Sequence, residues 1–215
     1  MRLIRRLQAG MSLVDAACMC VRDSMTTQHH TTTKGALSVS TKTALLVIDA
    51  QVGLLDEAYR HDEVVARIAD LIAKARATGA PIIYVQHDGD DDGRLAAGSP
   101  GWRIHPAILP QDGDPVVRKR SSDAFYETSL QRELQAREIG RLVIAGMKTE
   151  MCVDTTSRRA VSVGYDVTLA TDAHTTTDND VLPAARIVAH HNATLDDFGN
   201  DDHVVTIEET RSITL

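Results

Sequence analysis

Aromatic side chains, cysteines and long apolar runs are all scarce in this chain of 215 residues. Phe, Trp and Tyr together make up 3% of it, so a buried core has to be built mostly from Val, Ile, Leu and Ala. The three cysteines, Cys18, Cys20 and Cys152, are an odd number, and two of them lie close together near the N-terminus. This pattern is not a disulfide framework and fits a reducing compartment, so we expect a cytoplasmic protein.

Other absences exclude whole classes of partner. No apolar run approaches the roughly 20 residues that a membrane-spanning helix needs, so we expect no membrane partner. The formal net charge of −7 argues against a nucleic-acid partner. No Gly-x-Gly-x-x-Gly motif follows the first predicted strand, which argues against a dinucleotide site. We therefore expect a small-molecule substrate and no cofactor.

The first forty residues differ in composition from the rest of the chain. They begin with a basic stretch and contain the polar run Thr26–Thr33. A targeting segment is one interpretation, but two aspartates interrupt it. A disordered or subunit-contacting arm is another, and upstream sequence added by a start site placed before Met25 is a third. We predict a dispensable extension, residues 1–42, followed by one domain, residues 43–215.

Apolar runs alternate with amphipathic segments beyond residue 42. The runs are rich in β-branched residues and in places unbroken, which is typical of strands covered on both faces. With helices between most of them and no internal repeat, they predict an α/β fold: a single doubly wound, mostly parallel six-stranded sheet with helices on both faces. The predicted strands are 43–48, 81–86, 115–119, 141–145, 165–170 and 204–207, and the predicted helices are 61–79, 128–138, 154–163 and one that begins near Pro183.

Cys152 follows the predicted strand 141–145 and precedes the helix that starts at residue 154. Free N–H groups and the positive end of the helix dipole at such a turn would stabilise a thiolate. A thiolate is a good nucleophile, and the same N–H groups can bind a developing oxyanion. The alternative is that Cys152 is simply a small buried residue, and the local sequence does not choose between the two.

Two other predicted strands end in charged residues, Asp49 and Lys119. The carboxyl ends of parallel strands share one edge of the sheet, where ligands bind, so Asp49, Lys119 and Cys152 should converge. A carboxylate, a cation and a thiol can deprotonate the thiol, hold its charge and return a proton to a leaving group. With Arg120 beside Lys119, we expect charge attraction to lower the pKa values of Asp49 and Cys152.

Three segments, in this order and at this spacing, carry a family resemblance. They are Leu-Leu-Val-Ile-Asp-Ala-Gln at 45–51, Lys-Arg-Ser-Ser-Asp-Ala-Phe at 119–125 and Gly-Met-Lys-Thr-Glu-Met-Cys-Val at 146–153. Together they resemble the isochorismatase-like cysteine hydrolases, a superfamily that includes nicotinamidases and N-carbamoylsarcosine amidases. The resemblance runs from about Thr43 to Glu208 and leaves out the N-terminal segment.

The resemblance implies a mechanism. Asp49 would be the general base that takes the proton from Cys152, and the thiolate would attack a small amide or carbamoyl compound to form a thioester. Lys119 would hold the charged pair in place. The backbone N–H groups of Lys148 and Cys152 would form the oxyanion hole, and in the family a cis peptide bond precedes the residue that matches Lys148. Family members usually associate, which implies a homo-oligomer.

Four further residues are candidates for the substrate pocket: Gln51, His87, Trp102 and Phe125. The resemblance gives Gln51 a part in shaping the pocket and extends to Phe125. Trp102, the only tryptophan, either walls the pocket or packs its loop onto the core. The metal-binding nicotinamidases carry Asp-x-His with further histidines here, whereas this chain has only His87 and His105 at another spacing. We therefore predict no metal, and nicotinamide becomes a weaker candidate substrate.

Other functions remain open from the sequence. The isochorismatase branch of the superfamily cleaves a vinyl ether without needing the cysteine, so the presence of Cys152 places that activity second. A non-catalytic ligand-binding protein on the same fold and a redox-sensing thiol are further alternatives, and the second lacks a resolving cysteine in the domain. Arginines at positions 103, 118 and 120 would suit an amide substrate that bears a carboxylate.

Overall fold

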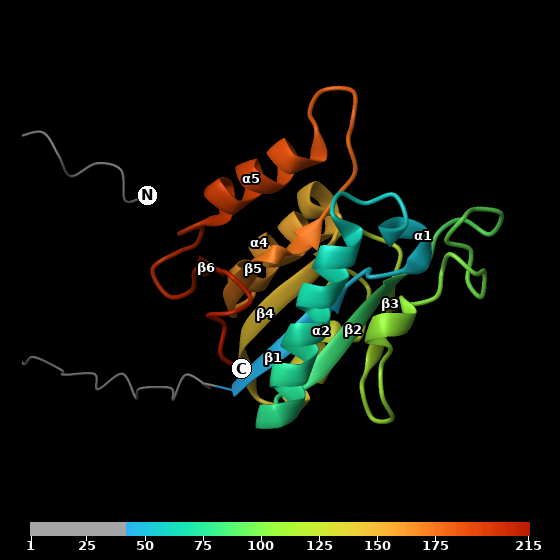
Figure 1. Ribbon diagram of the computed structural model, residues 1–215. Helices are drawn as coiled ribbons and strands as arrows, with labels where there is room; N and C mark the ends of the chain where they lie inside the picture. Colours follow the sequence, from blue (N-terminus) through green and yellow to red (C-terminus); the bar gives the residue numbers. More distant parts are fainter. Residues whose placement is uncertain (1–41) are drawn as a thin grey trace, which may run out of the picture. The chain divides into compact units, whose positions relative to one another are not determined.

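The structure of the protein, a computed structural model, describes residues 42–215 (Figure 1). The predicted N-terminal extension lies outside the described residues, except for Lys42, which is the first residue of strand β1. Within the described part of the chain, no helix has the length and apolar character that crossing a membrane requires.

Strands and helices alternate along the described chain. The strands are β1 (Lys42–Ile48), β2 (Ile82–His87), β3 (Val116–Lys119), β4 (Ile139–Met147), β5 (Asp166–Thr175) and β6 (Val205–Glu208). The helices are α1 (Val52–Leu55), α2 (His61–Thr78), α3 (Leu130–Ala136), α4 (Asp154–Ser162) and α5 (Ala184–Leu195), with a 3₁₀ helix η1 (Pro106–Ile108) and a π-helical turn η2 (Thr149–Val153).

The six strands form one sheet in the order β3-β2-β1-β4-β5-β6. All five neighbouring pairs are parallel. The chain therefore builds the sheet outward from β1 to β3, returns to β4 beside β1, and continues outward to β6. The doubly wound sheet predicted from the sequence is confirmed, and the point where the strand order reverses lies between β1 and β4.

Helices cover both faces of the sheet, and the alternation of side chains along β1 shows how. Leu45 and Val47 pack in the cluster that contains the buried face of α2. Leu46 and Ile48 point the other way and pack with the buried residues of α3 and α4. In Figure 1, α2 accordingly crosses one side of the sheet, with α4 on the opposite side.

Helix α2 agrees closely with its prediction. Its apolar residues recur every three or four positions, so one stripe faces the sheet: Val64, Val65, Ile68, Leu71 and Ala75 are buried. Asp62 and Glu63 lie in the first turn, where the helix dipole favours negative charge. Gly79 ends the helix with φ 74°, in the left-handed conformation that glycine adopts most easily.

Strand β5 is longer than predicted, because it continues through Thr175 instead of ending at Ala170. Its register against β4 shifts between Ile144 and Gly146, as at a β-bulge. The polar pair Thr171-Asp172 resembles a strand end in the sequence, but here it lies within the strand at the irregularity. Local polarity alone cannot distinguish these two cases.

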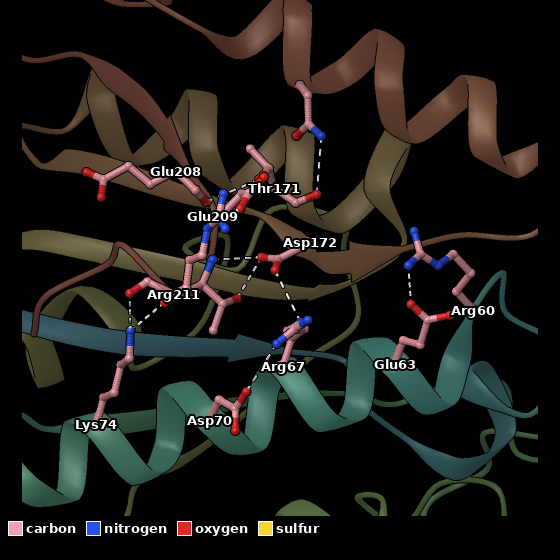
Figure 2. A network of polar contacts seen from close by, with 12 residues as sticks. Arg60, Glu63, Arg67, Asp70, Lys74, Thr171, Asp172, Glu208, Glu209 and Arg211 are labelled. Atoms are coloured by element: carbon pink, nitrogen blue, oxygen red, sulfur yellow. Dashed lines mark hydrogen bonds and ion pairs between the residues drawn. The ribbon is translucent and has the colours of Figure 1, made fainter.

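A polar network fastens the C-terminal segment to α2 and β5 (Figure 2). The Lys74 ammonium donates to three backbone carbonyl oxygens between Thr210 and Ile213. Asp172 accepts from both the backbone N–H and the hydroxyl of Thr210. Arg67 pairs with Asp172 from the α2 side. The polar residues of the β5 bulge therefore hold the end of the chain in place.

Gly146 sets how closely β1 and β4 approach beside the point where the strand order reverses. It pairs with Ile48, has φ 125°, and an added Cβ would lie 1.9 Å from the Ile48 carbonyl oxygen. We expect Gly146→Ala to lower the free energy of unfolding by more than about 3 kcal/mol in urea denaturation. Gly79→Ala is the matched control, since Gly79 also has positive φ but open space around it, and should cost about 1 kcal/mol. Equal costs would contradict the close-approach explanation.

Candidate active site

Three polar residues meet at the carboxyl edge of the sheet, where doubly wound folds bind ligands. Asp49 directly follows β1, Lys119 is the last residue of β3, and Cys152 lies in η2 just after β4. Because β1 and β4 are neighbours, Asp49 and Cys152 leave the sheet at the point where the strand order reverses. Lys119 comes from beyond β2 and reaches across its end. The sequence prediction that these side chains converge is confirmed by their contacts.

The Lys119 ammonium is the centre of the cluster. Its Nζ donates to Asp49 Oδ2 at 2.7 Å, to the Ser121 carbonyl oxygen at 2.9 Å and to Cys152 Sγ at 3.2 Å. His87 Nδ1 lies 3.3 Å away. Asp49 and Lys119 are only 1% and 2% exposed. The ammonium therefore has four neighbours for three protons, and it holds the carboxylate and the thiol on either side of itself.

The backbone fixes the Asp49 carboxylate tightly. Asp49 has φ 48°, a left-handed conformation that Asp and Asn tolerate better than most residues. Its N–H donates to the Val85 carbonyl oxygen at 2.8 Å, which ties it to the end of β2. Among residues 42–215, its buried Oδ1 atom has no hydrogen-bond partner. One oxygen of the carboxylate is thus bound to Lys119 and the other is free to take a proton.

Burial dominates the pKa values of this cluster. Desolvation raises the pKa of the Asp49 carboxyl, although the Lys119 ammonium opposes that rise. Burial also raises the pKa of the Cys152 thiol to about 11, with the Asp49 carboxylate adding to the rise and Lys119 opposing it. The expectation that nearby cations lower both values was therefore wrong. Their attraction is present, but removal of water from the site outweighs it.

His87 contacts the Lys119 ammonium from the end of β2. It is the last residue of β2 and pairs in register with Lys119. Burial, followed by the Lys119 charge, lowers the pKa of its half-buried imidazole, so the ring is neutral near pH 7. A neutral ring can accept a hydrogen bond at Nδ1 from the Lys119 ammonium. His87 thus contacts the cation, whereas the sequence suggested only a contact with the substrate.

The turn that carries Cys152 is organised around the carbonyl group of Lys148. That oxygen accepts from the N–H groups of Met151 and Val153, each at 3.1 Å. The Met147–Lys148 peptide bond is cis, as it is in the family that the three segments resemble. The N–H of Lys148 itself has no backbone acceptor among the described residues. The two N–H groups predicted to bind an oxyanion therefore belong to one compact turn.

A buried histidine supports this turn from behind. His174 Nδ1 lies 2.9 Å from the hydroxyl of Thr149, and its Nε2 lies 2.8 Å from Asn192 Oδ1. Burial lowers the pKa of His174 to about 4, so it is neutral near pH 7. His174 therefore links η2 to β5 and α5 and has a structural role in the turn.

Two cavities open near these residues. One of about 200 Å³ is lined by Asp88, Arg118, Lys119, Arg120, Ser121, Tyr126 and Glu127. The other, of about 680 Å³, has Lys148 in its wall. Across residues 42–215 there is no group of three or more His, Cys, Asp or Glu side chains placed to hold a metal ion.

Comparison with known proteins places the chain in a family. The protein-family model named isochorismatase domain matches residues 43–194. This range is most of the described chain and includes Asp49, Lys119 and Cys152. The chain belongs to the isochorismatase family. The fold and the residue pattern that suggested this superfamily are thereby confirmed.

Two named relatives are about a third identical to this isochorismatase-family protein over the aligned residues. A streptothricin hydrolase of Streptomyces noursei is 37% identical over 153 residues, 66% of this chain and 55% of that protein. The ureidoacrylate amidohydrolase RutB of Methylobacterium radiotolerans is 33% identical over 156 residues, 54% of this chain and 60% of that protein. The chain thus spans a little over half the length of these two curated relatives.

Solved structures of the family agree with the fold. The crystal structure of an isochorismatase from Pseudomonas putida KT2440 is 34% identical, with a TM-score of 0.74 over 80% of this chain and 89% of that one. A cysteine hydrolase from Pseudomonas syringae pv. phaseolicola is 27% identical, with a TM-score of 0.71 over 79% of this chain and 89% of that one.

Gln51 supports this isochorismatase-family site from behind and offers no group to a substrate. It is fully buried, and its Nε2 donates to the carbonyl oxygens of His87 and Trp102. Its Oε1 accepts from the His87 N–H at 2.9 Å. Every polar group of the amide is therefore bonded to backbone. Gln51 positions His87, which differs from the substrate contact predicted for it.

The two aromatic candidates both pack against other side chains, which is one of the two alternatives that the sequence left open for Trp102. Trp102 donates from its indole to Asp88 at 2.8 Å, and the Arg118 guanidinium stacks 5.1 Å from its ring centre. Phe125 packs on the core and stacks with Tyr165, their ring centres 5.9 Å apart. Neither residue lines the smaller cavity beside Lys119. The aromatic residue in the wall of that cavity is Tyr126, which follows Phe125 in the chain. Adjacent loop residues point in different directions, and the sequence carries no signal for which one faces the cavity.

Asp49 and Lys119 shift the pKa of the Cys152 thiol in opposite directions, so removing one of them gives a testable prediction. Asp49→Asn removes the carboxylate that raises the pKa of the thiol, keeps a residue tolerant of left-handed φ, and leaves Lys119 in place. The pKa of Cys152 should then fall below about 11. The pH profile of Cys152 alkylation by iodoacetamide should then have its midpoint at a lower pH than in wild type. Mass spectrometry follows the alkylation at each pH, with Cys152→Ala as the blank. A midpoint at or above that of wild type would contradict the prediction.

Proposed function

We propose that this chain is a cysteine-dependent hydrolase that cleaves a C–N bond of a small amide or carbamoyl compound. The observation that carries the proposal is the Lys119 ammonium, which contacts Asp49 Oδ2 and Cys152 Sγ at once and is almost fully buried together with Asp49. A buried carboxylate and a partly buried thiol on one cation suit proton transfer followed by nucleophilic attack. A relative that is an amidohydrolase by name supports the same reaction class.

The first step makes the nucleophile. With a pKa of about 11, Cys152 is a neutral thiol near pH 7, so it needs a base. Asp49 has a raised pKa and a free buried oxygen, which suits it to accept the proton from Sγ. The negative charge then moves from the carboxylate to the sulfur. Lys119 contacts both atoms, so it balances the charge before and after the transfer.

The second step breaks the C–N bond. The thiolate attacks the carbonyl carbon, and the carbonyl oxygen becomes an oxyanion that the N–H groups of Lys148 and Cys152 receive. Donors of this kind typically lower a barrier by about 3 kcal/mol each. Asp49 returns its proton to the leaving nitrogen, and the tetrahedral intermediate collapses to a thioester. A water molecule, deprotonated by Asp49, then hydrolyses the thioester and restores the thiol.

The amide reaction is preferred over vinyl ether cleavage because of how the cysteine is placed. Ether cleavage in the isochorismatase branch does not need a cysteine. Here Sγ lies 3.2 Å from a buried ammonium, in the same turn as candidate oxyanion donors. A thiol with no part in the reaction would have no need of this arrangement.

Release of ammonia tests the proposal directly. A panel of small amides, ureido acids and carbamoyl compounds is incubated with wild type and with Cys152→Ala. We expect wild type alone to release ammonia, because the thioester cannot form without the thiol. Cys152→Ala should lose at least about 10³-fold in kcat while its thermal unfolding changes little. Mass spectrometry of the quenched wild-type reaction should show the acyl adduct on Cys152.

Two outcomes would decide against the amidase mechanism. Full turnover by Cys152→Ala would exclude a thioester and point to a reaction that does not use the cysteine. Hydrolysis without ammonia, carbon dioxide or amine as product would show that the bond cleaved is not a C–N bond. Chorismate-type vinyl ethers are included in the panel so that the second candidate reaction has its own readout.

A pair of His87 variants distinguishes the two candidate roles of that ring. His87→Asn places an acceptor near the position of Nδ1, which faces Lys119, whereas His87→Gln places its polar group near the position of Nε2. If His87 acts by holding the ammonium, Asn should keep kcat within about tenfold of wild type and Gln should lose more. If the ring instead contacts the substrate through Nε2, Gln should be the better variant and its defect should lie in KM.

A further inference from the structure

The larger cavity, of about 680 Å³, has no assigned role in the reaction steps described above. Its wall is built by the α1 segment, Arg94 from the loop after β2, Lys148 from the turn after β4, and Thr177 and Asp178 from the segment before α5. Cavities of this volume hold small ligands. All of these segments follow the carboxyl ends of strands or lie beside them, so the cavity opens on the catalytic edge of the sheet.

Among the positively charged side chains that line this cavity, the Lys148 ammonium is the one that forms no ion pair with a carboxylate of the described residues. Arg94 pairs with Glu57 at 3.1 Å and with Asp56 at 3.2 Å. Asp178 accepts a hydrogen bond from the Ala184 N–H at the start of α5. The Lys148 ammonium donates to the Thr177 hydroxyl at 2.9 Å and forms no ion pair with a carboxylate within residues 42–215.

Lys148 is also part of the turn that carries Cys152. The Lys148 carbonyl accepts from the N–H groups that flank Cys152, those of Met151 and Val153. The backbone of Lys148 therefore belongs to the turn that carries Cys152, while the residue also lines the larger cavity. A substrate whose carbonyl carbon is attacked by Cys152 could thus extend from the oxyanion donors toward the ammonium.

Two of the three arginines that the sequence suggested for a carboxylate are less available than Lys148. Arg118 is bound to both oxygens of Asp88 through its Nε and lies over Trp102. Arg120 lies 3.8 Å from Asp91, and its side chain is 72% exposed, where solvent weakens any binding that it provides. The cation that lacks a carboxylate partner and lines the larger cavity is Lys148.

We propose that the larger cavity binds a carboxylate of the substrate, held by the Lys148 ammonium and the Thr177 hydroxyl. The proposal rests on the proposed function and narrows its substrate class to amides or carbamoyl compounds that bear a carboxylate. A singly charged carboxylate fits better than a phosphate, because Glu57 and Asp178 in the same wall repel the additional negative charge of a phosphate.

Matched substrates test the proposal by comparing charge at constant shape. N-carbamoylglycine is compared with its methyl ester, and succinamate with succinamide, on wild type, Lys148→Met and Lys148→Arg. We expect wild type to prefer the acid of each pair by about tenfold or more in kcat/KM, mainly through KM. Lys148→Met should abolish that preference, and Lys148→Arg should retain part of it. The ratio within each pair cancels any effect of the substitution on the backbone of the turn.

Arg120→Met is the control for the other cavity. If the carboxylate binds at Lys148, this variant should keep the preference of wild type for the acids. Loss of the preference in Arg120→Met together with its retention in Lys148→Met would place the anion beside Lys119 and overturn the proposal. Equal kcat/KM for the acid and the neutral partner in wild type would overturn it as well.

A second readout separates this proposal from the amidase mechanism. The four compounds are also tested for protection of Cys152 against iodoacetamide, which requires binding but no turnover. If wild type hydrolyses none of them, the acids should still protect its Cys152 better than their neutral partners, and should not protect Lys148→Met. That result would remove support from the amidase mechanism and keep the carboxylate site. Absence of protection by either acid in wild type would overturn the carboxylate site.

Discussion

The contact between Lys119 and Asp49 is the constraint on which the site depends. Both side chains are almost completely buried, and an ion pair loses most of its hydration there. Removing either partner would leave an uncompensated buried charge, which typically costs about 3–5 kcal/mol. Such a pair persists only where the backbone holds both ends. Here the ends come from β1 and β3, and the side chain of Lys119 has to span the end of β2 to reach the carboxylate.

The elements around this pair explain several otherwise unrelated features. Asp49 can turn toward Lys119 because it adopts a left-handed conformation directly after β1. β4 can lie close enough to bring Cys152 alongside because Gly146 presents no side chain to Ile48. Gln51 uses its whole amide to fix the backbone at the end of β2, and so fixes His87 against the ammonium. Each feature serves to place one of the four neighbours of Lys119.

Sequence reasoning reached the parts of the site that depend on strand order. Asp49, Lys119 and Cys152 each follow or end an apolar run, and parallel strands bring such ends together. It did not reach properties that depend on depth and direction. The pKa values of Asp49 and Cys152 are raised and not lowered, because burial outweighs the cations. The sequence shows the cations but not the burial. Gln51 and Phe125 turned inward, because whether a loop side chain faces a cavity or the core depends on backbone geometry that no local pattern encodes.

The rise of both pKa values does not hinder proton transfer between Cys152 and Asp49. Desolvation penalises the carboxylate before the transfer and the thiolate after it, so the two penalties largely oppose each other in the difference between the states. The ammonium contacts both atoms, and its attraction is therefore present in both states as well. The free-energy difference between the two states then depends mainly on how the surroundings of the carboxylate differ from those of the sulfur. In the proposed mechanism, such a site keeps its thiol protonated, and hence weakly reactive toward oxidants, until the proton moves to the carboxylate.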